Sequence, residues 1–330
     1  MAMIFIILYF VSSGLFWRVA TNILKGVFMH ISKKIPLFLL VAFVLFMVSF
    51  HSVRAENRSG GGSATSPLTL AQLLQKTMST MEHLTSVSYN LNSMTSMTIS
   101  DPSSAVGNAQ TLVMILMGSG VHVLSGDAKG HLSINTDGKN ITLNEIVKGQ
   151  QCYVENQKGQ WYVLSTSAIQ RSAFASPELT NYGGLFTLSN VQTADDSFTT
   201  LDGSRVRHVT LRFNKNVITD LLNSTGALNG LTASQKQHIS TLLPYVTLKN
   251  AVLDMWIDAS TAYIHRFQLQ FDMGIDMSQL MMPTPGTASS PVTIESAQTI
   301  TLNYSQFNAP VTITAPFNAI PTDNILAVLK

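Results

Sequence analysis

The spacing of hydrophobic residues changes period along this chain, and each period predicts a different element. Apolar residues at three- and four-residue intervals after Ser66-Pro67 predict an amphipathic helix of about four turns, with the serine as cap and the proline in the first turn. The residues of this stripe are Leu70, Leu73, Leu74, Met78 and Met81. From Val87 to Ile99 the period becomes two, which predicts a long strand with one buried face.

Short alternating segments predict many more strands on both sides of the middle of the chain. Asp137-Gly138, Lys158-Gly159 and Asp202-Gly203 mark turns between them. The predicted strands are 111–117, 120–125, 131–136, 139–144, 151–156, 160–165, 197–201, 205–213, 249–257, 262–273, 292–304 and 310–315. Helices are predicted at 217–223 and 233–243 and in part of 167–190, and a Met-rich loop at 277–291. With no internal repeat, these elements predict an α+β fold in which a few helices pack on one continuous antiparallel sheet.

The N-terminus has the pattern of a secretory leader. Lys33 and Lys34 precede an uncharged apolar run of 16 residues, 35–50, and Val53-Arg54-Ala55 offers a cleavage site. The run is shorter than the roughly 20 residues that a membrane span needs, which favours cleavage over an uncleaved anchor. An earlier apolar stretch leaves open a true start at Met29 or a membrane hairpin.

These features divide the chain into four parts. We expect a leader at 1–55, a Gly/Ser-rich linker at 56–66, one folded domain at 67–320 and a C-terminal tail at 321–330.

Composition excludes several classes of function. Only 12% of the residues are charged, and the net charge of +2 comes without a cluster of Lys and Arg, so no nucleic-acid partner is expected. The single cysteine, Cys152, excludes an intramolecular disulfide framework and a thiolate metal cage, and we expect it to be a small buried apolar residue.

Several strands are apolar on both faces, most clearly 111–117, so both faces of the sheet need a cover. Few helices are predicted for that task, which leaves room for a cavity that a hydrophobic ligand would fill. The candidate wall residues are Leu112, Met114, Leu116, Leu253, Met255, Phe267, Leu269 and Phe271. The helix residues Leu70, Leu74, Met78 and Met81 could form a lid or ordinary packing.

Signals for catalysis are weak, and no catalytic residue, metal site or cofactor is expected. The sequence has no nucleophile elbow, no zinc-binding helix motif and no phosphate loop, and its histidines are scattered singly. Asp254 and Asp258 flank Trp256 on one face of a strand, which places the carboxylates about 13 Å apart. That separation is too wide for a pair of carboxylates acting on one bond.

Four parts of the chain carry recognisable motifs: 146–161, which ends in Trp161, then 202–208, then 252–258 with 264–267, and finally 307–316. Together they resemble the LppX/LprG-type exported lipoproteins. The resemblance implies a half-open antiparallel barrel, similar to the LolA carriers, whose helices lie against the concave side. It also implies a cavity for the acyl chains of lipids or lipoproteins. The family's lipidated cysteine is missing after Ala55, which implies release or an uncleaved helical anchor.

Together these observations predict an exported, extracytoplasmic and non-catalytic protein that binds or carries a lipid or another acyl-chain amphiphile. Two alternatives stay open: an envelope sensor that binds a membrane protein partner, and a surface structural protein without a cavity. A hydrolase that depends on an acid such as Asp254 is a more distant one.

Overall fold

The computed structural model describes residues 68–100, 109–123, 126–136, 138–149, 151–164, 191–213, 237, 243–276, 293–323 and 328. The predicted leader and linker, the segments 167–190 and 277–291, helix 217–223 and most of helix 233–243 lie outside these residues. No helix in the described part of the chain is long and apolar enough to cross a membrane.

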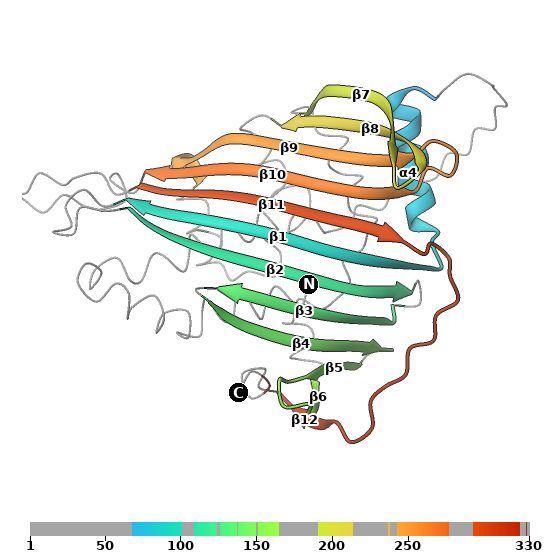
Figure 1. The fold of residues 1–330 in the computed structure, drawn as a ribbon, viewed down its shortest axis with the longest axis vertical. Helices are drawn as coiled ribbons and strands as arrows, with labels where there is room; N and C mark the ends of the chain where they lie inside the picture. The colour runs from blue at the N-terminus through green and yellow to red at the C-terminus, as the bar shows by residue number, and fades with distance from the viewer. Residues whose placement is uncertain are drawn as a thin grey trace, which may run out of the picture.

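The described residues form a single 12-stranded sheet with one long helix (Figure 1). The elements are α4 (Leu70–Glu82), β1 (Ser86–Ser100), β2 (Gln110–Val123), β3 (Ala128–Thr136), β4 (Lys139–Lys148), β5 (Gln151–Glu155), β6 (Trp161–Leu164), β7 (Val191–Leu201), β8 (Ser204–Phe213), the 3-10 turn η2 (Leu243–Tyr245), β9 (Val246–Asp258), β10 (Ile264–Asp276), β11 (Thr293–Ser305) and β12 (Ile320–Thr322). The prediction of one continuous antiparallel sheet is confirmed.

Strand β1 lies in the middle of the sheet, with β2 to β6 and β12 on one side and β7 to β11 on the other. The strand order is β12-β6-β5-β4-β3-β2-β1-β11-β10-β9-β8-β7, so the first long strand pairs with the last long one. All neighbours pair antiparallel except β12, which lies parallel to β6. The edge strands β7 and β12 lie at opposite ends of the sheet in Figure 1.

Two strand predictions are wrong. The predicted strands 111–117 and 120–125 are not separate, because β2 runs through Gly118 and Gly120 to Val123 and these glycines continue the ladder with β1 instead of turning. Segment 310–315 is not a strand: its alternate residues Val311 and Ile313 pack on a small apolar cluster with Ile146 and Tyr153, without pairing in the sheet. The other predicted strands in the described part are present, with boundaries shifted by a few residues in most cases, and β12 crosses the expected domain boundary at 320.

Helix α4 begins later than predicted. Its N-cap is Thr69, whose hydroxyl accepts a hydrogen bond from Gln72 N at 3.3 Å, while Gln72 Oε1 accepts one from Thr69 N at 3.0 Å. This reciprocal capping box satisfies two backbone N–H groups, so the cap is three residues after the expected Ser66.

Alternation along the strands gives the sheet two faces, which we name by what covers them. On the helix face, Leu73, Leu74 and Met81 of α4 share a buried cluster with Val209, Leu211, Leu253, Met255, Phe267 and Leu302. The opposite, outer face carries the C-terminal segment 311–319 over β4, β5 and β6. Asn308 starts that segment by accepting a hydrogen bond from Thr85 N at 2.7 Å.

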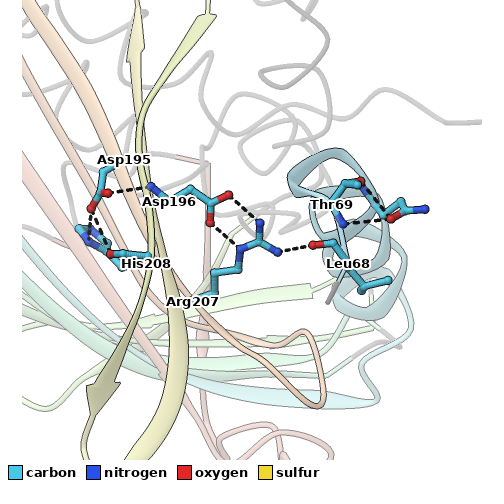
Figure 2. A network of polar contacts seen from close by, with 8 residues as sticks. Leu68, Thr69, Asp195, Asp196, Arg207 and His208 are labelled. Carbon is cyan, nitrogen blue, oxygen red and sulfur yellow. Dashed lines mark hydrogen bonds and ion pairs between the residues drawn. The ribbon is translucent and has the colours of Figure 1, made fainter. Parts of the chain in front are cut away.

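A polar contact joins the start of α4 to the edge of the sheet. Arg207 on β8 donates two hydrogen bonds to Asp196 on β7, and its Nη1 donates to the carbonyl of Leu68 at 2.6 Å (Figure 2). The hydrogen bond to Arg207 lowers the pKa of Asp196 and raises that of the arginine. This ion pair therefore links three segments at the position where the helix meets the sheet.

Candidate ligand-binding face

The strand register places all eight predicted wall residues on the helix face. Residues directly opposite each other in an antiparallel pair point to the same side of a sheet. One row across the sheet runs Leu116, Ser93, Ile300, Leu269 and Leu253. The row beside it runs Met114, Thr95, Gln298, Phe271 and Ala251. Residues predicted from two distant segments thus meet on one surface of five adjacent strands.

Leu112, Met255 and Phe267 are the remaining predicted wall residues, and they also lie on the helix face. Leu112 lies opposite Met97, two positions before Met114, and Phe267 lies opposite Met255, two positions before Leu269. Leu116, Leu253, Met255, Phe267 and Phe271 are buried, and Leu112, Met114 and Leu269 are half-buried. The partial exposure of these three makes them the accessible part of the predicted wall.

The candidate lid residues lie against one end of this face. Leu74 and Met81 are buried members of the cluster with the sheet, Leu70 packs on it from the side, and Met78 is half-buried. These contacts account for ordinary helix packing. A lid movement is not needed to explain the apolar stripe.

One row of the helix face consists of two polar residues and two glycines. It runs Tyr89, Gly120, Gly130 and Glu145 across β1 to β4. A Cβ at Gly120 would meet the Tyr89 hydroxyl at 2.7 Å, and a Cβ at Gly130 would meet it at 3.1 Å. The tyrosine side chain therefore lies along the sheet over both glycines, and its hydroxyl points toward the strand that carries Glu145.

Glu145 is an acid in apolar surroundings. Its neighbours on the helix face include Leu143 and Val154, both buried, and Cys152, whose thiol donates a weak hydrogen bond to Glu145 Oε1 at 3.7 Å. Burial raises the pKa of Glu145 to about 8 and that of the Cys152 thiol well above its ordinary value. Cys152 is buried as the sequence predicted.

The outer face holds a separate polar cluster. His208 Nε2 lies 2.9 Å from Asp254 Oδ1, His208 stacks on Trp256 with ring centroids 4.5 Å apart, and its Nδ1 lies 3.8 Å from Asp195. Figure 2 shows Asp195 and His208 turned away from α4, on the other side of the strands from Arg207. Thr210 donates to the same Asp254 oxygen, so its hydroxyl hydrogen points away from the imidazole.

The register confirms that Asp254 and Asp258 share the outer face with Trp256. Asp258 accepts four hydrogen bonds from Ser260 and Thr261 in the turn after β9, whereas Asp254 pairs with His208. The two carboxylates thus take part in different local contacts. Among the described residues, no group of three or more His, Cys, Asp and Glu side chains could hold a metal ion.

Sequence reasoning missed Glu145, Tyr89 and the His208 cluster. The signal for Glu145 is present in the strand Ile141, Leu143, Glu145, Val147, where an acid occupies a position of the apolar series. The partners of Tyr89 and His208 lie on other strands, so no local pattern could identify them.

No family model and no curated protein matches the chain. Solved structures with similar folds include LprF from Mycobacterium bovis, 12% identical over 76% of this chain and 99% of that one, with a TM-score of 0.38. LppX from Mycobacterium tuberculosis is 13% identical over 73% and 96%, with a TM-score of 0.33. A LolA-superfamily protein from Nitrosomonas europaea is 13% identical over 74% and 95%, with a TM-score of 0.20.

LppX is a member of the family that the sequence motifs resemble. With TM-scores below 0.5, none of these likenesses carries an argument about this chain. The arrangement of the helix face follows from the strand register of this chain.

Proposed function

We propose that this protein is an exported, non-catalytic carrier that holds the acyl chain of a lipid-like molecule against the helix face of its sheet. The observation that supports this proposal is the gathering of apolar residues from β2, β9 and β10 on the helix face, with α4 packed at one end of it. Ser93, Thr95 and Gln298 are polar positions between them. Leu112, Met114 and Leu269 lie on this face and keep partial exposure.

Removal of hydrocarbon from water would supply the affinity. An acyl chain that buries about 300 Å² gains roughly 7 kcal/mol at about 25 cal/mol per Å², before the cost of ordering the ligand. Methionine at position 114 suits such a role, because its flexible side chain adapts to chains of different shape. This mechanism requires an apolar binding surface and no catalytic group.

Export is part of the proposal and is supported by the leader pattern at residues 33–55. A carrier outside the cytoplasm would take up an amphiphile from one membrane or protein and release it to another. Without a lipidated cysteine after residue 55, we propose that the protein is either released or held by its apolar leader.

The test is recovery of bound amphiphile from the full-length protein, purified from the exported fraction and analysed by native mass spectrometry and organic extraction. We expect lipid at a fixed ratio to protein. Met114→Gln on the helix face should lower that ratio several-fold, because it places an amide where the chain would lie. Met117→Gln is the matched control on the outer face, where Met117 is 49% exposed, and it should leave the ratio unchanged. Recovery of no amphiphile from any host would contradict the proposal.

A further inference from the structure

Most side chains of the helix face are apolar. The row from Tyr89 to Glu145 differs, because it has a polar side chain at each end and glycines between them. Gly120 and Gly130 separate these two residues in the row, and the absence of their side chains lets the tyrosine lie flat between β1 and β4. Adjacent strands lie about 4.8 Å apart, so a hydroxyl beside Gly130 is one strand away from the residue opposite it, Glu145. The Tyr89 hydroxyl thus lies on the side of its row toward Glu145, close enough for the charge of Glu145 to raise the pKa of Tyr89.

Neither group has a strong partner within the described residues. The recorded contact of the Glu145 carboxyl is the thiol of Cys152 at 3.7 Å, and a thiol is a weak donor. No hydrogen bond of the Tyr89 hydroxyl is found in the described part of the chain. Both residues are half-buried, so the missing hydrogen-bond partner of each can be water or a polar group of a ligand that enters this face.

We propose that Tyr89 and Glu145 form the subsite that receives the uncharged polar end of the bound amphiphile, a hydroxyl or ester group, while its hydrocarbon lies along the apolar rows toward β10. This inference rests on the proposed carrier function and adds to it a chemical class of ligand and a direction of binding. The row of Tyr89 runs parallel to that of Leu116 and Leu269, two rows away on the same face.

The protonation of the pair fits an uncharged group. Burial raises the pKa of Glu145 to about 8, so near neutral pH the carboxyl is mostly protonated and can both donate and accept a hydrogen bond. Burial and the nearby Glu145 also raise the pKa of Tyr89, which keeps its hydroxyl as a donor. An anionic headgroup would be repelled by Glu145 at higher pH, where the carboxyl is ionised. A cationic amine would instead favour the ionised carboxylate.

The test compares three probes of one chain length on the full-length protein: a monoacylglycerol, a fatty acid and a long-chain primary amine. Binding is measured by calorimetry at about pH 6 and about pH 9, on either side of the titration of Glu145. We expect the monoacylglycerol to bind about tenfold more tightly than the fatty acid, which is the size of effect of one or two hydrogen bonds.

Four variants assign this preference to the subsite. Glu145→Leu and Tyr89→Phe should each remove it and leave fatty-acid binding in place, and the phenylalanine keeps the ring over Gly120. In the wild type the preference should increase at about pH 9, where the ionised Glu145 repels the fatty-acid anion. Glu145→Gln should keep the preference at about pH 6 and remove this increase, because the amide does not ionise. Glu295→Gln makes the same chemical change on an exposed outer-face residue and should alter nothing.

The outcomes separate the two proposals. If no probe binds to the wild type, the carrier function itself fails. If all probes bind and neither Glu145→Leu nor Tyr89→Phe changes the preference, or if the amine binds most tightly at both pH values, the subsite is overturned and the carrier function stands. Circular dichroism of each variant identifies loss of folding, in which case the comparison rests on Tyr89→Phe and Glu145→Gln.

Discussion

The side chain of Tyr89 lies in the space that a side chain at position 120 would need. A Cβ on Gly120 would come within 2.7 Å of the tyrosine hydroxyl and within 2.5 Å of the backbone carbonyl of Lys129. The tyrosine could swing aside, but the carbonyl belongs to the ladder between β2 and β3 and cannot move freely. Glycine at this position is therefore required by the space between the strands.

Gly120→Ala should lower the free energy of unfolding by about 1 to 3 kcal/mol, the usual cost of forcing an extra methyl group into a packed site. Chemical denaturation followed by circular dichroism measures it. Gly118→Ala is the matched control on the same strand and face, where the nearest atom to the new Cβ is 3.4 Å away. Equal losses in the two variants would show that Tyr89 and the Lys129 carbonyl do not limit position 120.

Arg207→Lys should destabilise the contact between α4 and the edge of the sheet. A lysine cannot keep the paired hydrogen bonds to Asp196 together with the one to the Leu68 carbonyl, and charged hydrogen bonds of this kind contribute about 1.5 to 3 kcal/mol. The pair is only partly exposed, with 12% of the arginine side chain accessible. We expect a loss of about 1 to 2 kcal/mol in the free energy of unfolding and faster amide exchange in the first turn of α4.

The control for this prediction is Lys249→Gln, which breaks the exposed pair between Lys249 and Glu295. Exposed ion pairs contribute between about 0 and 1 kcal/mol, so this variant should be close to the wild type. A similar effect of both substitutions would contradict a special role for Arg207.

Glu145 should make the protein less stable as the pH rises. Its pKa in the folded state is about 8, against an ordinary value of 4.5, so between these values the folded state binds more protons than the unfolded state. Stability from this group is present below its unfolded pKa and declines as the pH rises, by at most about 1.4 kcal/mol for each pH unit.

Glu145→Gln removes that titration, so its free energy of unfolding should fall less than that of the wild type from about pH 5 to about pH 8. Denaturation midpoints across this range, measured without added lipid, provide the check. Identical pH profiles for the two proteins would mean that the carboxyl has an ordinary pKa and remains hydrated.

Asp258 should act in the opposite direction at low pH. Burial alone would raise its pKa, but the hydrogen bonds from Ser260 and Thr261 outweigh this effect and lower it to about 2. Because the folded pKa lies below the ordinary 3.8, its contribution is full above that value and is lost as the pH falls through about 2.

Asp258→Asn should therefore cost about 1 to 2 kcal/mol of unfolding free energy at neutral pH, and the difference from the wild type should vanish near pH 2. Asp202→Asn, in the exposed turn between β7 and β8, serves as the control, since asparagine also tolerates the positive φ of 50° found there. A constant difference between Asp258→Asn and the wild type at every pH would argue against a lowered pKa.

Much of the local structure of this protein could be predicted from its sequence. The stripe from Leu70 to Met81 forms α4, and the alternation from Val87 to Ile99 forms β1. Asp202-Gly203 makes the tight turn between β7 and β8, with Leu201 opposite Ser204 and positive φ at both turn residues. These features depend on residues within a few positions of one another, so the spacing of apolar and turn residues in the sequence is enough to predict them.

Local pattern failed where distant residues decide the conformation. The sequence Gly118-Ser119-Gly120 has the composition of a turn, but it stays extended in β2 because it pairs with β1 and β3 on both sides. The alternation at 310–315 is that of a strand, yet this segment forms no strand pairing. It lies over the outer face near β5, because its apolar residues pack on a cluster there.

The apolar character of the wall residues was therefore determined by the sequence, whereas their gathering on one face was decided by the tertiary structure. Leu116 and Leu269 lie far apart in the chain and come into one row only through the pairing of β1 with β11. The pairing across β1 to β4 likewise places Tyr89 and Glu145 in one row. Register between strands depends on the combined burial of many side chains, and no single segment carries that information.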